Sequence, residues 1–296
     1  MISILTCSYN REKYLYKLYK SLIKQTLYDF EWIVVDDGSE DHTGKLMDSL
    51  INRTNEFHIS YYYQQNGGKH KAVNEGMRHV LGEWVFLVDS DDELVSDAIE
   101  TIQKWVSELR KESDFEKFAA VSGLKALRNG KILGGFPNIK KAKFIDAKNT
   151  ERKKYRLGGD KAEVYKVQIL RKYPFPTFHN EKFLSEDAVW NKIAIDGYKI
   201  RWYPKVIYLC DYLGNGLTKD ENKYINSFDG FTYVTKISLE AFHGIYKIRP
   251  ITKYIYYAKM KGYNSSEIIS TLNIPCWNYF VGVVMCWAYK IIKKLR

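Results

Sequence analysis

An acidic cluster directly follows an apolar run near residue 90. The run WVFLV occupies positions 84–88, and DSDDE occupies positions 89–93. An apolar run bounded by polar residues predicts a buried strand, so the acids should lie where this strand leaves the core. Clustered carboxylates repel one another unless water or a cation compensates their charge. The chemistry open to such a cluster is to hold Mg²⁺ or Mn²⁺ against a diphosphate through Asp89 and Asp91, because hard cations prefer oxygen ligands.

The same acids have a second interpretation. A bare Asp-x-Asp pattern also occurs in solvated turns, and here Asp92 or Ser96 could cap the helix that follows. The position of the acids directly after a buried strand favours the cation site over the solvated turn.

The elements that must position these acids alternate between strand and helix. Hydrophobic patterning predicts a helix after each of the first three strands, and the strands are expected at 3–8, 32–35, 59–65 and 83–89. Such alternation predicts parallel pairing, with helices on both faces of an open sheet. Ligands bind such sheets at the carboxyl ends of the strands. We therefore expect four polar clusters to share one edge: Thr6–Arg11, Asp36–Ser39, Gln65–Lys69 and Asp89–Asp92.

The sequence lacks the usual phosphate-binding patterns of such sheets. The residues after the first strand, TCSYNR at 6–11, contain no glycine, and no Walker loop is present. An acidic edge repels a phosphate unless a divalent cation lies between them. The pattern thus disfavours a dinucleotide-dependent oxidoreductase and favours a metal-bridged diphosphate.

Composition and charge indicate an ordinary globular chain. The protein has 296 residues, of which 45% are hydrophobic, and a net charge of +11. Residues 1–100 carry −7, residues 101–235 carry +10 and residues 236–296 carry +8. No nucleic-acid-binding motif occurs, and the expected ligand edge is acidic, so a nucleic acid is not an expected partner. Four cysteines without metal-ligand spacing and no signal peptide predict a cytoplasmic protein.

Four motifs together resemble the family 2 glycosyltransferases of the Rossmann-like GT-A fold. They occur in order as TCSYNR, VVDDGSEDHT, QQNGGKHKAVNEGM and FLVDSDDEL. The resemblance is strong over residues 1–110 and looser to about 215. It implies a mostly parallel mixed sheet flanked by helices, with a catalytic domain at 1–215. Within that domain, 1–110 would bind a nucleotide sugar, usually a UDP-sugar, and 111–215 would bind the acceptor.

The resemblance also implies roles for individual residues. Asp37 would accept a hydrogen bond from the uracil N–H, Asp91 would be the principal metal ligand, and Asp89 would face both the ribose and the metal. The full nucleotide-binding set is Thr6, Ser8, Tyr9, Arg11, Asp37, Asn66, Lys69, Asp89 and Ser90. The alternatives are a helix cap for Asp37, a solvated lysine for Lys69 and ordinary packing for Tyr9.

A general base is expected in the segment 181–200. Ser185 or an acid should cap a helix there, which places Glu186 and Asp187 on its first turn. The pair looks like the Glu-Asp motif of the family, in which the Asp usually removes the proton from the acceptor hydroxyl. We therefore predict Asp187 as the base, with Glu186 as its rival because the flanking sequence resembles relatives that retain only the Glu. The alternative is that neither acid is catalytic and that Glu186 and Asp187 only stabilise the N-terminus of the helix through their negative charge.

The C-terminal region 216–296 is expected to be helical and basic. Residues 277–289 carry no charge and precede Lys290, Lys293, Lys294 and Arg296. This run is too short for a membrane span. It predicts a segment that lies in a membrane interface with its cations on lipid headgroups, or else one packed on the protein or a partner chain. Residues 210–224 predict a loop that closes over the nucleotide.

Together these features predict a metal-dependent, inverting glycosyltransferase. It would move a sugar from a UDP-sugar to a glycan or polyprenyl-linked acceptor during synthesis of a capsular, extracellular or other surface polysaccharide. The protein would lie on the cytoplasmic face of the cell membrane. A non-catalytic glycan- or lipid-binding relative with the same fold is the alternative.

Overall fold

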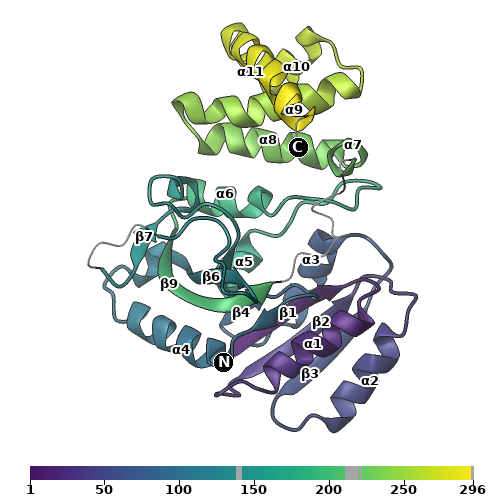
Figure 1. Ribbon diagram of the computed structural model, residues 1–296, viewed down its shortest axis with the longest axis vertical. Helices are drawn as coiled ribbons and strands as arrows, with labels where there is room; N and C mark the ends of the chain where they lie inside the picture. Colours follow the sequence, from purple (N-terminus) through teal and green to yellow (C-terminus); the bar gives the residue numbers. More distant parts are fainter. Residues whose placement is uncertain (138–141, 211–219, 221, 295–296) are drawn as a thin grey trace.

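The computed structural model describes residues 1–137, 142–210, 220 and 222–294, with side chains described as far as Trp287. A sheet domain with helices on both faces forms the lower part of the molecule in Figure 1, and a group of C-terminal helices forms the upper part. The predicted closing loop at 210–224 falls largely outside the described residues, as does the predicted domain boundary near 215.

Four parallel strands form the N-terminal half of the sheet, in the order β3-β2-β1-β4. They are β1 (Ile2–Ser8), β2 (Phe30–Asp36), β3 (His58–Tyr63) and β4 (Trp84–Leu87). The helices between them are α1 (Glu12–Leu22), α2 (Thr43–Arg53) and α3 (Lys69–His79). All of these elements follow the predicted pattern, because their apolar residues recur with strand or helix periodicity.

The second half of the sheet continues from β4 with antiparallel β8 (Lys161–Lys166). The order then runs β8-β6-β9-β5, with β7 also paired to β9. These strands are β5 (Glu93–Leu94), β6 (Phe118–Leu127), β7 (Ile145–Ala147) and β9 (Lys199–Cys210). The helices of this half are α4 (Ala98–Leu109), α5 (Val167–Lys172) and α6 (Asp187–Ile195).

Most strands of the described sheet run in one direction. Within the described residues, β3, β2, β1, β4, β6 and β9 run together, whereas β8, β5 and β7 run against them. The predicted mixed, mostly parallel sheet is therefore confirmed. The parallel half places the carboxyl ends of its strands along a single edge, where a ligand can meet all of them.

The core lies in two layers, one on each face of the sheet. Ile4 and Trp32 pack in the layer that contains Leu18 of α1, and Leu5 packs in the layer that contains Val73 of α3. Neighbouring strand residues belong to opposite layers because side chains alternate along a strand. Both layers are apolar, which explains why these strands read as continuous hydrophobic runs.

Residues 118–133 form a short hairpin. Its first arm is β6, and its turn contains Gly130, which has a φ of +83°. The returning arm pairs with β6 through the bridge from Ala126 to Ile132 and a hydrogen bond of 2.9 Å from Leu133 N to Lys125 O. Beyond this arm the chain turns toward the loop before β8, where Gly135 N donates a hydrogen bond to Gly158 O at 2.7 Å.

The C-terminal helices form a cluster with its own apolar core, in which Phe231, Tyr254 and Ile268 are buried. They are α7 (Lys223–Asn226), α8 (Phe228–Ala241), α9 (Ile248–Met260), α10 (Ser265–Leu272) and α11 (Cys276–Lys294). Helix α8 lies next to α6, so the cluster covers the end of the acceptor half (Figure 1). The helical prediction for this region is confirmed over the described residues.

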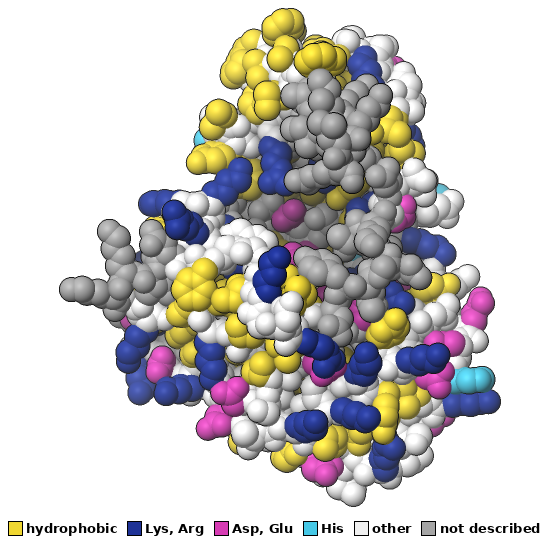
Figure 2. Space-filling view, viewed as in Figure 1, with side chains coloured by type: hydrophobic (Ala, Val, Ile, Leu, Met, Phe, Trp, Pro, Cys, Tyr) yellow, Lys and Arg dark blue, Asp and Glu magenta, His cyan; other side chains and the backbone are white. Residues whose placement is uncertain are grey.

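Hydrophobic side chains gather on the outer end of this cluster (Figure 2). On α11, Trp277 is 65% exposed and Trp287 is 71% exposed, and Phe280, Val284 and Met285 are exposed as well. Within the described chain, no single helix has both the length and the hydropathy of a membrane span. Ser265–Leu272 and Cys276–Trp287 meet that criterion only as a pair, and they are bent by 117° to each other.

Candidate active site

The four polar clusters meet at one edge of the sheet, as predicted. Asp37 N donates to Ser8 O at 2.8 Å, which joins the ends of β1 and β2. Asn10 N donates to Ser39 Oγ at 2.8 Å, which links the same two loops a second time. The loop before α3 joins them through Asp37, and the end of β4 joins through Lys69. The sheet thus holds these clusters in contact without a ligand.

Asp37 anchors the loop that precedes α3. Its Oδ1 accepts hydrogen bonds from Gln64 Nε2 at 2.7 Å and Gly67 N at 2.8 Å, and its Oδ2 accepts one from Gly68 N at 2.7 Å. The residue is only 4% exposed. The carboxylate is therefore engaged inside the protein, and its predicted contact with a uracil ring stays a prediction.

Gly68 allows the segment before α6 to lie against the start of α3. Its φ is +95°, and a Cβ at this position would come within 2.0 Å of Lys182 O. No other residue fits, because any side chain would collide with that backbone oxygen. This close approach brings the start of α3 next to the start of α6, and so joins the nucleotide half to the acceptor half.

Lys69 bridges the two halves electrostatically. Its Nζ lies 2.6 Å from Asp89 Oδ1 and 2.8 Å from Glu186 Oε1. Burial opposes the charge of Lys69, but the two carboxylates raise its pKa well above the ordinary value. Burial also opposes ionisation of Asp89, yet Lys69 and Lys125 hold the pKa of this carboxyl well below its usual range. At neutral pH these groups are charged, and they form a compensated network.

Several members of this network were not predicted from the sequence. Lys125 Nζ lies 3.6 Å from Asp89 Oδ2, and the Tyr208 hydroxyl accepts a hydrogen bond from Asp89 N at 2.8 Å. Lys161 and Glu163 line the same small cavity, of about 30 Å³. The sequence signal that points to them is a charged residue between apolar ones within a strand, as at Lys125 in β6 and Glu163 in β8.

Asp91 differs from Asp89 because no cation of the described residues forms a salt bridge with it, although the charges of Arg11 and Lys69 act on it from farther away. Burial and the neighbouring charge of Asp89 raise its pKa. Among the residues that the structure describes, none forms a salt bridge with it, and no three His, Cys, Asp or Glu side chains meet to form a metal site. A half-buried carboxylate of this kind fits a divalent cation whose remaining ligands come from a diphosphate.

Thr6, a predicted member of the nucleotide pocket, has its side chain in the core. It is fully buried, and its Oγ1 accepts a hydrogen bond from Trp32 Nε1 at 3.1 Å. The side chain packs on the same strand face as Ile4, and the contact of this residue with a nucleotide stays a prediction. Ser8 is also buried, at 2% exposure, and its Oγ has no hydrogen-bond partner among the described residues.

The remaining predicted nucleotide-binding residues lie at the same edge and differ in exposure. Tyr9 is 47% exposed, which leaves its ring free of the packing considered as an alternative. Arg11 lies over the ring of Tyr14 and is half-buried. Asn66 Nδ2 donates to Asp37 O at 2.8 Å, and Ser90 is buried at the tip of β4. Their contacts with a nucleotide stay predictions.

Glu186 and Asp187 point into different spaces. Glu186 pairs with Lys69 beside the end of β4, whereas Asp187 lines a larger pocket below the C-terminal helices. Burial raises the pKa of Asp187, and the charge of Glu186 raises it further. The predicted cap by Ser185 is wrong, because α6 has no side-chain cap, and Ser185 Oγ contacts Asp187 Oδ2 at 3.4 Å.

This mixed sheet, with carboxylates at the ends of its parallel strands, has the architecture of the GT-A fold. A family model described as "Glycosyl transferase family 2" matches residues 3–162, more than half of the chain. The chain belongs to this family. The resemblance inferred from the four motifs is thereby confirmed.

Two curated relatives show how far the similarity extends. The chain is 35% identical to the glycosyltransferase GlyG of Streptococcus pneumoniae over 108 residues, which is 36% of each chain. It is 26% identical over 245 residues to the GalNAc(5)-diNAcBac-PP-undecaprenol beta-1,3-glucosyltransferase of Campylobacter jejuni, covering 75% of this chain and 77% of that enzyme. The match thus spans about a third of GlyG but most of the second enzyme.

Two solved structures share the fold. Staphylococcus aureus TarS 1–349 in complex with UDP-GlcNAc has a TM-score of 0.63 and 20% identity, covering 95% of this chain and 79% of that one. The mannosyltransferase PcManGT from Pyrobaculum calidifontis, in complex with GDP-Man and Mn²⁺, has a TM-score of 0.57 and 16% identity, covering 96% and 73%. The likeness to TarS extends beyond the sheet, since it covers nearly the whole chain.

Proposed function

We propose that the chain transfers a sugar from a UDP-sugar to a glycan or polyprenyl-linked acceptor in bacterial surface-polysaccharide synthesis, with inversion at the anomeric carbon. The observation that carries this proposal is the Asp89-Lys69-Glu186 network, with the uncompensated Asp91 beside it. It supplies charge for a metal-bound diphosphate at the junction of the two halves. The UDP-GlcNAc complex of TarS and the undecaprenol-linked substrate in the name of the Campylobacter jejuni enzyme support the two substrate classes.

A divalent cation, Mn²⁺ or Mg²⁺, fits Asp91 as the principal ligand and Asp89 as the second. When bound, it would neutralise charge on the departing UDP, a contribution of several kcal/mol to transition-state stabilisation. Lys69 keeps Asp89 ionised through a hydrogen bond of 2.6 Å from its Nζ to Asp89 Oδ1. Because Lys69 and Lys125 already compensate Asp89, Asp91 is the carboxylate with the greater need for a cation.

Asp187 is the better candidate for the general base. An inverting transfer requires a carboxylate on the acceptor side, opposite the departing diphosphate, that removes the proton of the attacking hydroxyl. Glu186 is held by Lys69 on the diphosphate side, whereas Asp187 faces the larger pocket. Its raised pKa also makes Asp187 a stronger base than an ordinary aspartate.

The metal site is tested with Asp91→Asn. We expect the variant to lose thermal stabilisation by UDP in Mn²⁺ and to lose UDP-sugar turnover, because the amide oxygen carries no full charge. Asp48→Asn, on the exposed face of α2, is the matched control. Near wild-type stabilisation and turnover in the Asp91 variant would refute the metal site.

The base is tested with Asp187→Asn and Glu186→Gln. Asp187→Asn should keep UDP-sugar affinity while turnover falls by about 10²- to 10⁴-fold. In the wild type, activity should fall on acidification through the raised pKa of Asp187, and any residual activity of Asp187→Asn should lack this limb. If Glu186→Gln alone is inactive and retains donor binding, the two roles exchange.

The exposed face of α11 supports peripheral binding to the cytoplasmic face of the membrane. Trp277, Phe280 and Trp287 present large apolar side chains to solvent, as interfacial segments do. The side chains of the basic terminus that follows lie outside the described residues. Sedimentation with anionic vesicles should retain the wild type and lose the Trp277→Ser/Trp287→Ser double variant. Equal retention of both would exclude this face as the membrane contact.

A further inference from the structure

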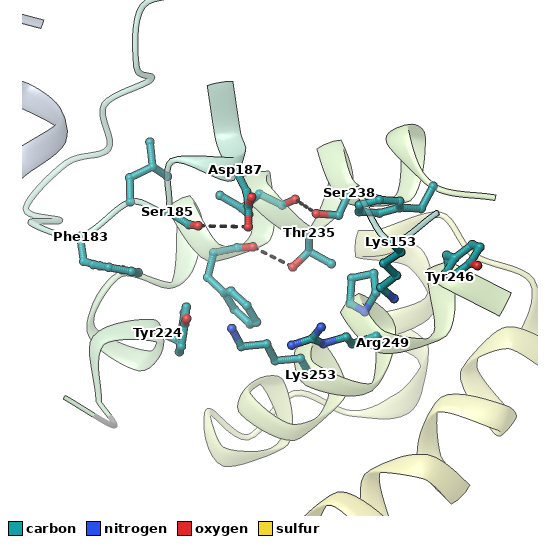
Figure 3. Close-up of a pocket in the computed structure, with 15 residues that line it drawn as sticks. Lys153, Phe183, Ser185, Asp187, Tyr224, Thr235, Ser238, Tyr246, Arg249 and Lys253 are labelled. Atoms are coloured by element: carbon teal, nitrogen blue, oxygen red, sulfur yellow. Dashed lines mark hydrogen bonds between the residues drawn. The ribbon is translucent and has the colours of Figure 1, made fainter. Parts of the chain in front are cut away.

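A second pocket lies between α6 and the C-terminal helices, apart from the small cavity around Lys69 (Figure 3). Its volume is about 290 Å³, and it is lined mainly by residues of α8, of α9 and of the segment 183–187 at the start of α6. Asp187 lies on one side of the space, and Arg249 and Lys253 of α9 lie on the other. Most of this lining falls outside residues 3–162, the part of the chain that the family model matches.

Three cations enter this pocket from segments distant in sequence. Lys153 follows the short helix η2 (Asn149–Glu151), and Arg249 and Lys253 lie one turn apart on α9. None of the three is ion-paired with a carboxylate within the described part of the chain. Lys253 Nζ lies instead 3.7 Å from the centre of the Tyr224 ring, and Lys153 Nζ lies 4.7 Å from that of Tyr246.

The charge in the pocket is therefore unbalanced. Burial lowers the pKa of Lys253 to about 8, the repulsion of Arg249 acts in the same direction, and the attraction of Asp187 does not offset them. One carboxylate faces three cations. Lys253 is half-buried, whereas Lys153 and Arg249 are exposed to solvent. Three cations that line one pocket favour an anionic ligand, and guanidinium and ammonium groups together are well suited to phosphate oxygens.

The rest of the lining suits a ligand with sugar or hydrocarbon parts. Aromatic rings and hydroxyl groups surround the charged side chains, as in pockets that combine apolar walls with a few orienting polar groups. The rings are Phe183, Tyr224, Phe231, Phe242 and Tyr246, and the hydroxyls are Ser185, Thr235 and Ser238. An uncharged glycan would fill the walls but leave the cations unpaired.

We propose that this pocket binds a phosphate group of the acceptor through Lys153, Arg249 and Lys253, so that the attacking hydroxyl lies beside Asp187. The inference rests on the proposed function, because it takes the occupant to be the acceptor substrate. The phosphate could belong to a lipid diphosphate or to a phosphodiester of a polyol-phosphate polymer. Both sources present the same chemistry to the three cations.

Binding is measured on the full chain by isothermal titration calorimetry, with Mg²⁺ and saturating UDP present so that the donor site is filled. The probes are farnesyl diphosphate, a ribitol phosphate oligomer and, as an uncharged control, farnesol. We expect one phosphate probe to bind and farnesol not to bind. Tighter binding of farnesyl diphosphate identifies a lipid-linked acceptor, and tighter binding of the oligomer identifies a polymer.

Arg249→Gln and Lys253→Gln should each weaken phosphate binding by about 10-fold, because each removes a charge-assisted hydrogen bond. Lys259→Gln is the matched control, since Lys259 is exposed on the same helix but does not line the pocket. Lys153→Gln provides an independent test from another segment should a change in α9 unfold the chain. If UDP binds but neither phosphate probe does, or if the Arg249→Gln/Lys253→Gln double variant binds like the wild type, the assignment is overturned. Failure of UDP itself to bind would count against the proposed function instead.

Discussion

The role of Asp37 can be tested by a substitution that keeps its shape. Asp37→Asn retains one oxygen, which can still accept from Gln64 Nε2 and Gly67 N, but it places an amide NH₂ against Gly68 N. One charge-assisted hydrogen bond is lost and two donors face each other. Such a bond contributes about 1.5–3 kcal/mol, so the loop before α3 should open more easily by roughly 2–3 kcal/mol.

Amide hydrogen exchange measures this opening directly. Since about 1.4 kcal/mol corresponds to a factor of ten, the Gly67 and Gly68 amides should exchange roughly 30- to 150-fold faster in the variant without any nucleotide. Asp48→Asn, which changes an exposed carboxylate of α2, should leave both rates unchanged. Wild-type exchange at Gly67 and Gly68 in Asp37→Asn would refute the anchoring role, whatever happens to UDP affinity.

Three further changes test the contacts that hold the site in place. Gly68→Ala should lower the free energy of unfolding in urea by roughly 2–5 kcal/mol, because the added Cβ would collide with a backbone oxygen. The control is Gly262→Ala, since Gly262 has a φ of +87° but no neighbour within 4 Å of an added Cβ. This control should cost only about 1–2 kcal/mol. Burial raises the pKa of Glu163 from 4.5 to about 7, so between these pH values the folded state holds a proton that the unfolded state has lost. The free energy of unfolding should therefore fall as pH rises from 4.5 to 7, by on the order of 1–3 kcal/mol. Measurements of Tm across this pH range should show that Glu163→Gln removes the slope. Arg201→Lys should lower the free energy of unfolding in urea by roughly 2–4 kcal/mol. The buried guanidinium donates to both carboxylate oxygens of Asp146, at 2.8 and 2.7 Å, and a lysine has only one nitrogen with which to replace these two bonds. A variant as stable as the wild type would contradict this prediction.

The sequence alone determined the elements of the N-terminal half and the edge where its polar residues meet. Each strand from β1 to β4 is a local apolar run, and each helix between them has a local period, so no distant contact is needed to predict them. The parallel arrangement follows from their alternation, and it forces the four polar clusters to one edge. The strand parity of Thr6, which it shares with Ile2 and Ile4, was also present in the sequence and would have placed its side chain in the core.

Only the tertiary structure decided which charges meet. Lys69 and Glu186 are 117 residues apart, and their contact depends on the close approach of two loops at Gly68. The sequence placed Glu186 and Asp187 side by side, yet the fold directs one toward Lys69 and the other into the pocket that Arg249 and Lys253 line. Local patterns fix where a strand or helix forms, but the partner of a side chain is set by the register and packing of segments that the chain joins only at long range.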